Sequence, residues 1–288
     1  RRAPRRRAGR CGGGCVPFAP QDPPFDPGGE TPASYPLARD ASLRPRRSPA
    51  PGGRLTGGPA LLEAVPGAER YPARHDVHDA VLVRGAERIP VVVKRIRRDF
   101  RQPDGRTRAE RAERIARHLL SLGIDTPEPL AVEVRQEESV LVVRKVEGAV
   151  QVREYFLHRD DPSRDVPAVS EPFEAVVAAL GRLARRLHDA GVFFRDFSDG
   201  NVLVTPGPRL WLVDLDRARV RSGPLRTLNR FRDLSRPGLN RPEDGRLLLG
   251  AYYAPGPVPA FAPGLLALLR RRLLAWNRFK RAVRPWRR

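Results

Sequence analysis

The order of strand-forming and helix-forming segments constrains the fold of this chain more than any other feature. Two β-rich runs, HDAVLV (78–83) and IPVVVKRI (89–96), flank the glycine-containing segment RGAE, and this arrangement predicts a hairpin. Two more runs, PLAVEVR (129–135) and SVLVVRKVE (139–147), read as further strands. We therefore expect a small sheet in the first half of the folded region.

The segment between the two strand pairs, TRAERAERIARHLLSL (107–122), has the pattern of an amphipathic helix. Ile115, Leu119 and Leu122 recur at helical spacing, and charged residues fill other positions. Gly123 is a suitable residue to end this helix.

The next part of the chain is mainly helical. A long amphipathic helix is predicted over residues 171–191, and residues 223–253 and 263–283 have helical patterns as well. Two short apolar runs, NVLVT (201–205) and RLWLVDL (209–215), predict a small hairpin between them. A sheet with one helix, followed by helices with a small hairpin, predicts an α+β fold of two lobes with a cleft.

Composition divides the chain into four parts. Residues 1–60 are rich in Pro, Gly and Arg and cannot bury enough apolar surface to offset their ordering entropy. We expect a disordered tail there, or an upstream extension foreign to the natural protein. The N-terminal lobe is expected over residues 61–147, the C-terminal lobe over 148–262, and a basic amphipathic helix over 263–288.

The chain is strongly basic, with a formal net charge of +21 that comes almost entirely from arginine. Part of this excess fits the coding bias of a GC-rich genome, and the other interpretation is an anionic partner such as nucleic acid, a membrane surface or a phosphorylated substrate. No apolar run approaches the ~18 residues of a membrane-spanning helix. Cys11 and Cys15 are the only cysteines, and two ligands with no histidine nearby are too few for a metal site. Two cysteines in a glycine-rich segment also give no sign of a disulfide-built fold.

Four polar residues have the chemistry that phosphoryl transfer requires. Lys94 ends the run PVVVK, Asp196 and Asn201 share the loop RDFSDGN, and Asp214 directly follows an apolar strand. Transfer needs a lysine for the phosphates, a carboxylate for the hydroxyl proton, and an amide and second carboxylate for Mg²⁺. Taken singly, each is an ordinary turn, cap or strand-end residue, but their order and context together favour a site.

These motifs resemble the signature of the protein-kinase-like superfamily: the strand lysine at 94, the R-D-x-x-x-x-N loop at 195–201, and the metal-binding aspartate in VDLD at 213–216. The resemblance implies ATP as donor and Mg²⁺ as cofactor. It implies that Asp196 is the catalytic base, that Asn201 and Asp214 are metal ligands, and that Lys94 contacts the phosphates.

Other stretches more narrowly resemble the lipopolysaccharide-core kinases, the Kdo/heptose kinase family. They are LGIDTPEPLAVE (122–133), WLVDLDRARV (211–220) and LNRFRDLSRPGLNRPEDGRLLLGAYY (228–253), in addition to RDFSDGNVLV. In the superfamily a glutamate on the first helix pairs with the strand lysine. Glu110 and Glu113 are both candidates, and Glu113 is favoured because it lies nearer the middle of the helix.

The chain departs from the superfamily pattern at three points. Phe194 stands where protein kinases usually have histidine, and the metal motif reads DLD in place of DFG. No G-x-G-x-x-G precedes Lys94, so we expect atypical nucleotide contacts there. His188 is expected to pack or cap its helix, and Asp216 to be an ion-pair partner of Arg217 or Arg219 in preference to a second metal contact.

The C-terminal segment, residues 264–288, is basic and amphipathic. One hypothesis is a helix that lies on an anionic membrane surface, with arginines at the lipid phosphates. The other, favoured for residues 264–276, is a helix docked on the C-terminal lobe with a solvated basic face. The end, RAVRPWRR, is the better candidate for membrane or anionic-glycolipid contact.

Three functions compete. The favoured one is an ATP- and Mg²⁺-dependent kinase of a sugar hydroxyl in lipopolysaccharide inner core, Kdo or heptose, in the cytoplasm at the inner face of the bacterial inner membrane. The second is a RIO-like protein kinase or a small-molecule kinase of the same fold. The third is a non-catalytic basic binding protein, such as a pseudokinase or a nucleic-acid binder; the complete residue set, and the lack of an RNA-binding or helix-turn-helix motif, argue against it. The acceptor hydroxyl and the oligomeric state stay open.

Overall fold

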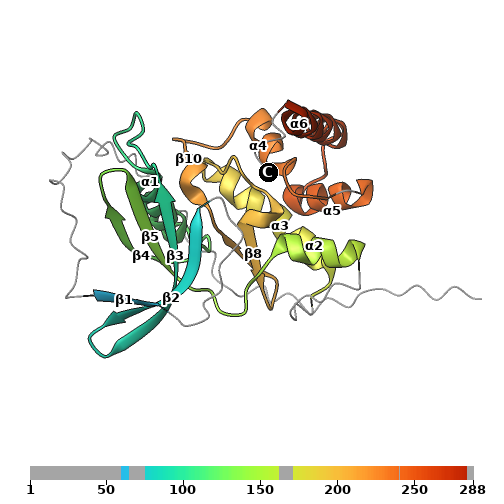
Figure 1. Ribbon diagram of the computed structural model, residues 1–288. Coiled ribbons are helices and arrows are strands. Elements are labelled where there is room, and N and C mark those ends of the chain that lie inside the picture. Colours follow the sequence, from blue (N-terminus) through green and yellow to red (C-terminus); the bar gives the residue numbers. More distant parts are fainter. Residues whose placement is uncertain (1–59, 65–74, 162–170, 240, 284–288) are drawn as a thin grey trace, which may run out of the picture. The chain divides into compact units, whose positions relative to one another are not determined.

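The protein is α+β, with an N-terminal antiparallel sheet and one helix followed by a mainly helical C-terminal part (Figure 1). This computed structural model describes residues 60–64, 75–161, 171–239 and 241–283. All of these residues belong to one compact unit, Ala50–Arg288. The tail expected over residues 1–60 lies outside the described residues except for Ala60, and so do residues 284–288.

The N-terminal sheet has five antiparallel strands in the order β1-β2-β3-β5-β4. Four of them match the predicted strands, whereas β1 was not predicted because its short sequence, ALLEA, does not alternate. Gly85 begins the tight loop between β2 and β3 with a φ of +58°, a conformation that favours glycine. The strands are β1 (Ala60–Ala64), β2 (Asp76–Arg84), β3 (Glu87–Arg97), β4 (Pro129–Val134) and β5 (Glu138–Arg144).

Helix α1 (Arg108–Ser121) confirms the predicted first helix. A capping box fixes its start: the Thr107 hydroxyl accepts a hydrogen bond from the Glu110 N–H, and the Glu110 carboxylate accepts one from the Thr107 N–H. Ile115 and Leu119 are buried as predicted, but Leu122 is 40% exposed because the helix has ended by that residue. Gly123 follows with a φ of +66°, as expected for a residue that ends a helix.

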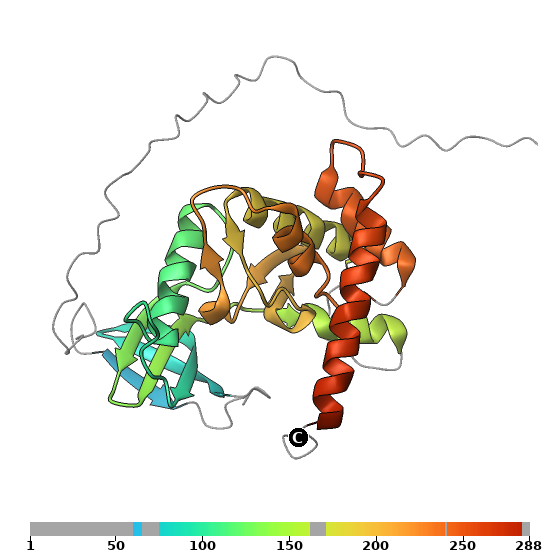
Figure 2. The ribbon, with the colours of Figure 1, turned by 90° about the horizontal axis from the view of Figure 1, so that it is seen from above.

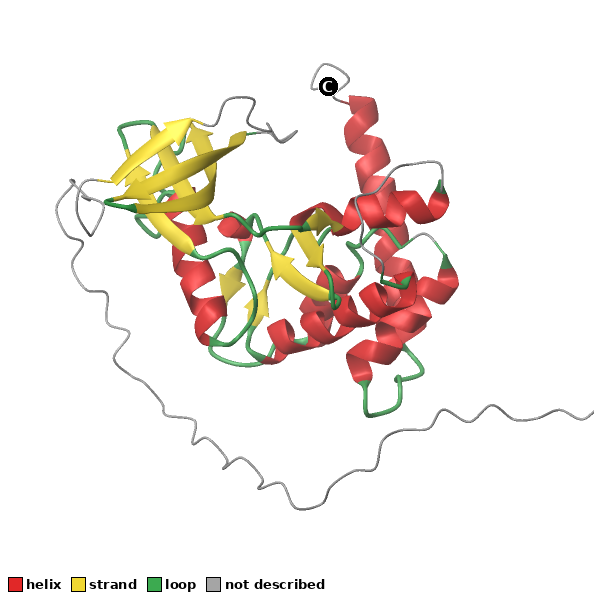
Figure 3. Ribbon diagram, turned by 90° about the horizontal axis from the view of Figure 1, so that it is seen from below, coloured by secondary structure: helices red, strands yellow, loops and turns green. Residues whose placement is uncertain are grey.

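The C-terminal part contains five helices in the described residues, and Figure 3 shows them gathered apart from the strands of the N-terminal sheet. Its large apolar cluster also includes α1, so one core extends from α1 to α6. None of the described helices combines the length and apolarity that crossing a membrane requires. The helices are α2 (Val152–Asp160), α3 (Phe173–Asp189), α4 (Thr227–Leu234), α5 (Pro242–Tyr253) and α6 (Ala262–Val283).

Short strands and turns connect these helices and carry the chemically interesting loops. The predicted hairpin is confirmed as β8 and β9, to which β6 adds a third strand, while β7 pairs with β10. Two 3₁₀ turns, η1 and η2, follow β7 and β9. Their bounds are β6 (Val150–Gln151), β7 (Val192–Phe193), η1 (Asp199–Asn201), β8 (Val202–Thr205), β9 (Arg209–Leu212), η2 (Leu215–Arg217) and β10 (Arg219–Val220).

Two helical predictions need correction. The segment 223–253 is not one helical stretch but α4 and α5, separated by a non-helical connection that contains Pro237 and precedes Pro242. Proline has no N–H to donate and restricts the residue before it, which explains the break. Helix α2 was not predicted, because nine residues show only one repeat of the apolar pattern.

Helices α3 and α5 approach each other closely at Gly181. A Cβ at this position would lie 2.6 Å from the backbone oxygen of Leu248 and 2.9 Å from the Cβ of Ala251. Only a residue without a side chain permits this approach. The contact packs α5 against α3, whose C-terminal end leads into the loop that contains Asp196.

Candidate active site

A buried carboxylate from α4 fixes the loop that contains Asp196. Asp233 is 1% exposed, and it accepts hydrogen bonds from the backbone N–H groups of Phe194 (2.8 Å) and Arg195 (2.9 Å). Arg195 has a φ of +67°, which is unusual for a residue with a side chain, so the backbone here needs such support. Phe194 is buried and packs edge-to-face on Phe197, consistent with an aromatic residue serving at the position where protein kinases have histidine.

The buried side chain of His188 lies next to the carboxylate of Asp233. Its Nδ1 lies 3.0 Å from the Tyr252 hydroxyl, and its Nε2 lies 3.6 Å from Asp233 Oδ2. Burial lowers the pKa of His188 and outweighs the opposing attraction of Asp233. The expected packing role is confirmed by an exposure of only 1%. The neutral ring therefore packs beside Asp233, the residue that holds the loop.

Asp196 lies between two arginines. Its Oδ2 accepts a hydrogen bond of 3.1 Å from Arg217 Nη1, and its Oδ1 lies 3.5 Å from Arg236 Nη1. The two guanidinium groups come from η2 and from the residue that follows the end of α4 by two positions. They orient the carboxylate and place positive charge on both sides of it.

Asn201 is fixed by the backbone of the same loop. Its Nδ2 donates a hydrogen bond of 2.9 Å to the backbone oxygen of Asp196, and this leaves the amide oxygen available to a ligand. Asp196 and Asn201 therefore belong to one loop, and a hydrogen bond joins them within it.

Lys94 of β3 forms an ion pair with Asp214, although the two residues are 120 positions apart. The Lys94 side chain is 18% exposed and that of Asp214 is 39% exposed, so the pair is open to a ligand. Asp214 has left-handed backbone angles, φ 60° and ψ 54°, which turn the chain from β9 into η2. Because η2 packs on α1, Asp214 lies close to the helix that accompanies the N-terminal sheet.

The glutamates of α1 do not pair with Lys94 in this structure. Glu113 accepts hydrogen bonds from Arg117 one turn later, with an Nη2–Oε1 distance of 3.0 Å, and Glu110 is engaged in the capping box. The carboxylate that faces Lys94 is therefore that of Asp214. The proposed nucleotide-site role of Glu113 has no support from its present contacts.

Asp216 also differs from the expectation. Within the described residues it forms no ion pair with Arg217 or Arg219, because Arg217 contacts Asp196 instead. Asp216 is 9% exposed, and burial together with the charge of Asp214 raises its pKa.

Comparison with known proteins identifies the family. Residues 86–241 match the lipopolysaccharide kinase (Kdo/WaaP) family. The chain belongs to this family. The matched span includes Lys94, the Asp196–Asn201 loop and Asp214, and also Asp233 and Arg236, which sequence reasoning did not single out. Membership in the Kdo/WaaP family implies a kinase fold.

Several curated relatives are named 3-deoxy-D-manno-octulosonic acid kinase. The protein from Vibrio cholerae serotype O1 is 22% identical over 158 residues, which cover 51% of this chain and 63% of the relative. The protein from Xylella fastidiosa is 28% identical over 120 residues, 40% of this chain and 43% of the relative. The protein from Xanthomonas campestris pv. campestris is 31% identical over 121 residues, 41% and 44% respectively. Each match spans less than two thirds of the relative's length.

The side chains of Asn201 and Asp214 fit the Mg²⁺ that such a kinase implies. Both offer oxygen ligands, and Mg²⁺ is commonly held by one or two protein carboxylates together with substrate phosphates. Among the described residues there is no cluster of three or more His, Cys, Asp or Glu side chains that could bind a metal by itself. Two oxygen donors from the protein would leave the remaining positions around Mg²⁺ to water and substrate phosphates.

Proposed function

We propose that this member of the Kdo/WaaP family is an ATP-dependent phosphotransferase that phosphorylates a sugar hydroxyl of lipopolysaccharide inner core, on Kdo or heptose. The observation that carries the proposal is the ion pair between Lys94 and Asp214 in a chain whose Asp196 is oriented by two arginines. The names of the curated relatives support a sugar acceptor.

The proposed roles are those that the resemblance to the protein-kinase-like superfamily implies, and the contacts of the side chains are compatible with them. Lys94 supplies positive charge for the α- and β-phosphates, and Asn201 and Asp214 would hold Mg²⁺, which neutralises phosphate charge when bound. Asp196 accepts the proton of the acceptor hydroxyl as the oxygen–phosphorus bond forms. The bond between the γ-phosphorus and the bridging oxygen breaks, and ADP leaves with that oxygen.

Arg217 and Arg236 have a positioning role in this scheme. Each contacts one oxygen of Asp196, so the carboxylate keeps one orientation toward the acceptor hydroxyl. Preorganised groups of this kind need no rearrangement during the reaction, and this lowers its barrier. We place the sites between the two lobes of a kinase-like fold, over residues 61–147 and 148–262. The reaction would take place in the cytoplasm, where ATP is available, at the inner face of the bacterial inner membrane.

ADP release by the purified chain tests the proposal. Turnover should require a deacylated lipopolysaccharide core oligosaccharide, and Asp196→Asn should lower kcat by about 10²- to 10⁴-fold, the usual worth of a general base. Arg88→Ala is the control, because Arg88 is exposed on the same strand as Lys94 and pairs with Glu63. Equal kcat values for Asp196→Asn and the unchanged protein would refute the proposed base. Turnover with a protein substrate such as casein, but not with the oligosaccharide, would favour a RIO-like kinase.

A further inference from the structure

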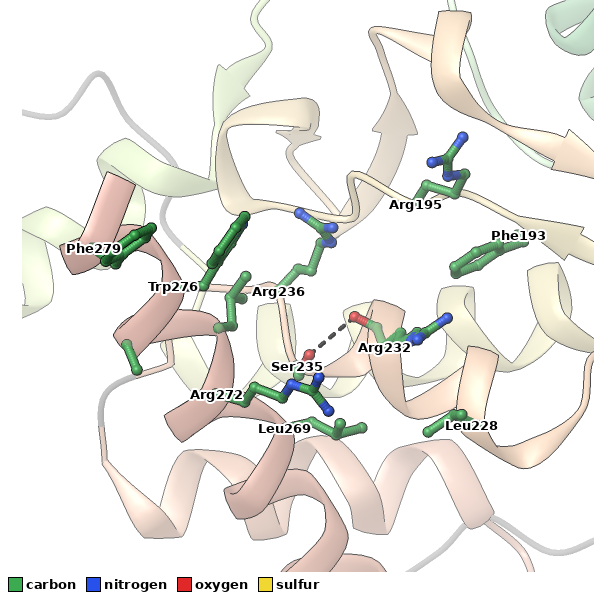
Figure 4. A pocket seen from close by; sticks show the side chains of 12 residues that line it. Phe193, Arg195, Leu228, Arg232, Ser235, Arg236, Leu269, Arg272, Trp276 and Phe279 are labelled. Carbon is green, nitrogen blue, oxygen red and sulfur yellow. Dashed lines mark hydrogen bonds between the residues drawn. The ribbon is translucent and has the colours of Figure 1, made fainter. Parts of the chain in front are cut away.

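A groove of about 890 Å³ lies beside Asp196 and is lined by residues of β7, α4 and α6 and of the segments that follow β7 and α4 (Figure 4). Arg236 lines this groove and also lies 3.5 Å from Asp196 Oδ1. Arg195, the neighbour of Asp196 in sequence, lines it too. A molecule bound in the groove would therefore lie next to the carboxylate proposed as the base.

One part of the lining is cationic. It contains Arg195, Arg232, Arg236 and Arg272, and in the described residues only Arg236 of these four has a carboxylate partner. The guanidinium groups of the other three form no hydrogen bond or ion pair within the described part of the chain. Burial and the charges of nearby arginines, Arg219 foremost among them, lower the pKa of Arg195. Of the arginines that lower this pKa, only Arg236 also lines the groove. A bound anion would supply the partner that the guanidinium groups of Arg195, Arg232 and Arg272 lack within the described residues.

Another part of the lining is aromatic and belongs to α6. Trp276 and Phe279 are 53% and 56% exposed, and their rings stack with centroids 5.7 Å apart at an interplanar angle of 22°. The C-terminal half of α6, which carries both rings, extends past the neighbouring helices (Figure 2). Exposed aromatic surface beside charged side chains is typical of a binding site, because a packed core would cover it.

We propose that this groove binds the acceptor and selects one that already carries an anionic group, phosphate or carboxylate, near the hydroxyl to be phosphorylated. The anion would bind to Arg195, Arg232 and Arg272, and an apolar face of the acceptor would lie on Trp276 and Phe279. Two observations support this assignment: the arginines of the lining complement an anion, and Arg236 of the lining contacts Asp196. The inference rests on the proposed function, because it treats the groove as the acceptor side of the same site.

The arrangement separates two tasks. Lys94 and Asp214 pair with each other, and neither residue lines the groove. A change in the groove should therefore alter the affinity for the acceptor and leave the affinity for ATP unchanged. A general loss of structure would instead lower the affinity for both the acceptor and ATP.

The test is calorimetric binding of deacylated lipopolysaccharide core oligosaccharide to the full chain without ATP. Arg232→Gln with Arg272→Gln should raise Kd by at least about tenfold, because charge-assisted hydrogen bonds to an anion are lost. Trp276→Ala should also weaken binding. The matched controls on the same helix are Arg278→Gln and Leu274→Ala, because both residues are exposed and neither lines the groove. Both controls should bind as the unchanged protein does.

Chemical variation of the ligand identifies what the groove recognises. The same oligosaccharide, dephosphorylated and carboxyl-reduced, should bind the unchanged protein weakly and should bind the double arginine variant equally weakly. Inorganic phosphate should compete only at much higher concentration if the carbohydrate face contributes.

Equal affinity of the double variant and the unchanged protein for the anionic oligosaccharide would overturn the proposal. A second result would also overturn it: the protein binds anionic liposomes that contain no saccharide, and Arg278→Gln lowers its affinity for these liposomes as much as Arg272→Gln does. Because this readout needs no turnover, loss of phosphotransferase activity with intact, arginine-dependent binding would count against the proposed function alone. If Arg232→Gln lowers the melting temperature, Arg272→Gln serves by itself, since Arg272 is exposed on α6.

Discussion

The carboxylate of Asp233 accepts a hydrogen bond from the backbone N–H of Arg195, with a distance of 2.9 Å, and thereby fixes the residue that precedes the proposed base. Asp233 is on α4 and is fully buried, whereas Arg195 has a left-handed backbone conformation. A buried acceptor that holds a strained loop makes the position of Asp196 depend on the packing of α4.

Removal of this acceptor should be costly. Asp233→Ala leaves the N–H groups of Phe194 and Arg195 without their partner, and an unsatisfied buried donor costs about 1–3 kcal/mol. We expect the free energy of unfolding to fall by about 2–4 kcal/mol and phosphotransferase activity to fall with it. Urea denaturation measures the first quantity. Glu133→Ala, at an exposed residue of β4, is the control. A difference below ~0.5 kcal/mol between the two variants would contradict the supporting role.

Asp214→Asn should separate metal binding from folding. An amide is a weaker ligand for Mg²⁺ than a carboxylate, so the Mg²⁺ concentration for half-maximal rate should rise and kcat should fall at least about tenfold. Stability should change little, because the partner of Asp214, Lys94, is partly exposed. Initial rates across a Mg²⁺ titration, with Glu63→Gln as a control from an exposed ion pair, measure the effect. An unchanged Mg²⁺ dependence would exclude Asp214 as a ligand.

Stability should decrease in acid through His188. Burial lowers the pKa of His188 in the folded protein below its ordinary value of 6.5, so the unfolded chain binds the proton first as pH falls. The contribution is therefore complete above pH ~6.5 and is lost below it, at up to about 1.4 kcal/mol per pH unit until the folded pKa is reached. His118, whose pKa is also lowered, stays in place in His188→Gln. The free energy of unfolding of this variant should fall less between pH 7.5 and 5.5; an equal fall in both proteins would contradict the assignment.

Two glycine substitutions should have opposite effects on the melting temperature. Gly181→Ala inserts a Cβ at 2.6 Å from the Leu248 oxygen, so α3 and α5 must separate, at a cost of about 1–3 kcal/mol or more. Gly250→Ala on α5 meets nothing within 4 Å and should stabilise the helix by up to about 1 kcal/mol. Thermal unfolding of the two variants compares the close approach with ordinary helix propensity. A melting temperature for Gly181→Ala at or above that of the unchanged protein would show that the helices do not pack as described.

Local patterns were sufficient where neighbours in sequence determine the structure. Alternation in β3, the 3.6-residue period of α1 and α3, and the turn residues between β8 and β9 are set within a few positions of each residue. The motif spacing likewise placed Asp196 and Asn201 in one loop, and the structure joins them through a hydrogen bond. Helix α2 was missed because nine residues carry too few repeats of the apolar pattern to identify a helix. The break between α4 and α5 was missed although Pro237 and Pro242 mark it in the sequence.

Tertiary packing decided which charges meet. Lys94 pairs with Asp214 because β3 and the end of β9 come together in the fold, whereas Glu113 is satisfied by Arg117 one helical turn away. The role of Asp233 could not be read from the sequence, because a carboxylate becomes a loop support only when its helix is buried against the loop. The sequence alone determined the types of the longer elements, such as β3, α1 and α3, and the chemical inventory of the candidate site. The partners of each charged group depended on long-range contacts, since electrostatic pairing is a matter of distance in space and burial, and neither follows from position in the chain.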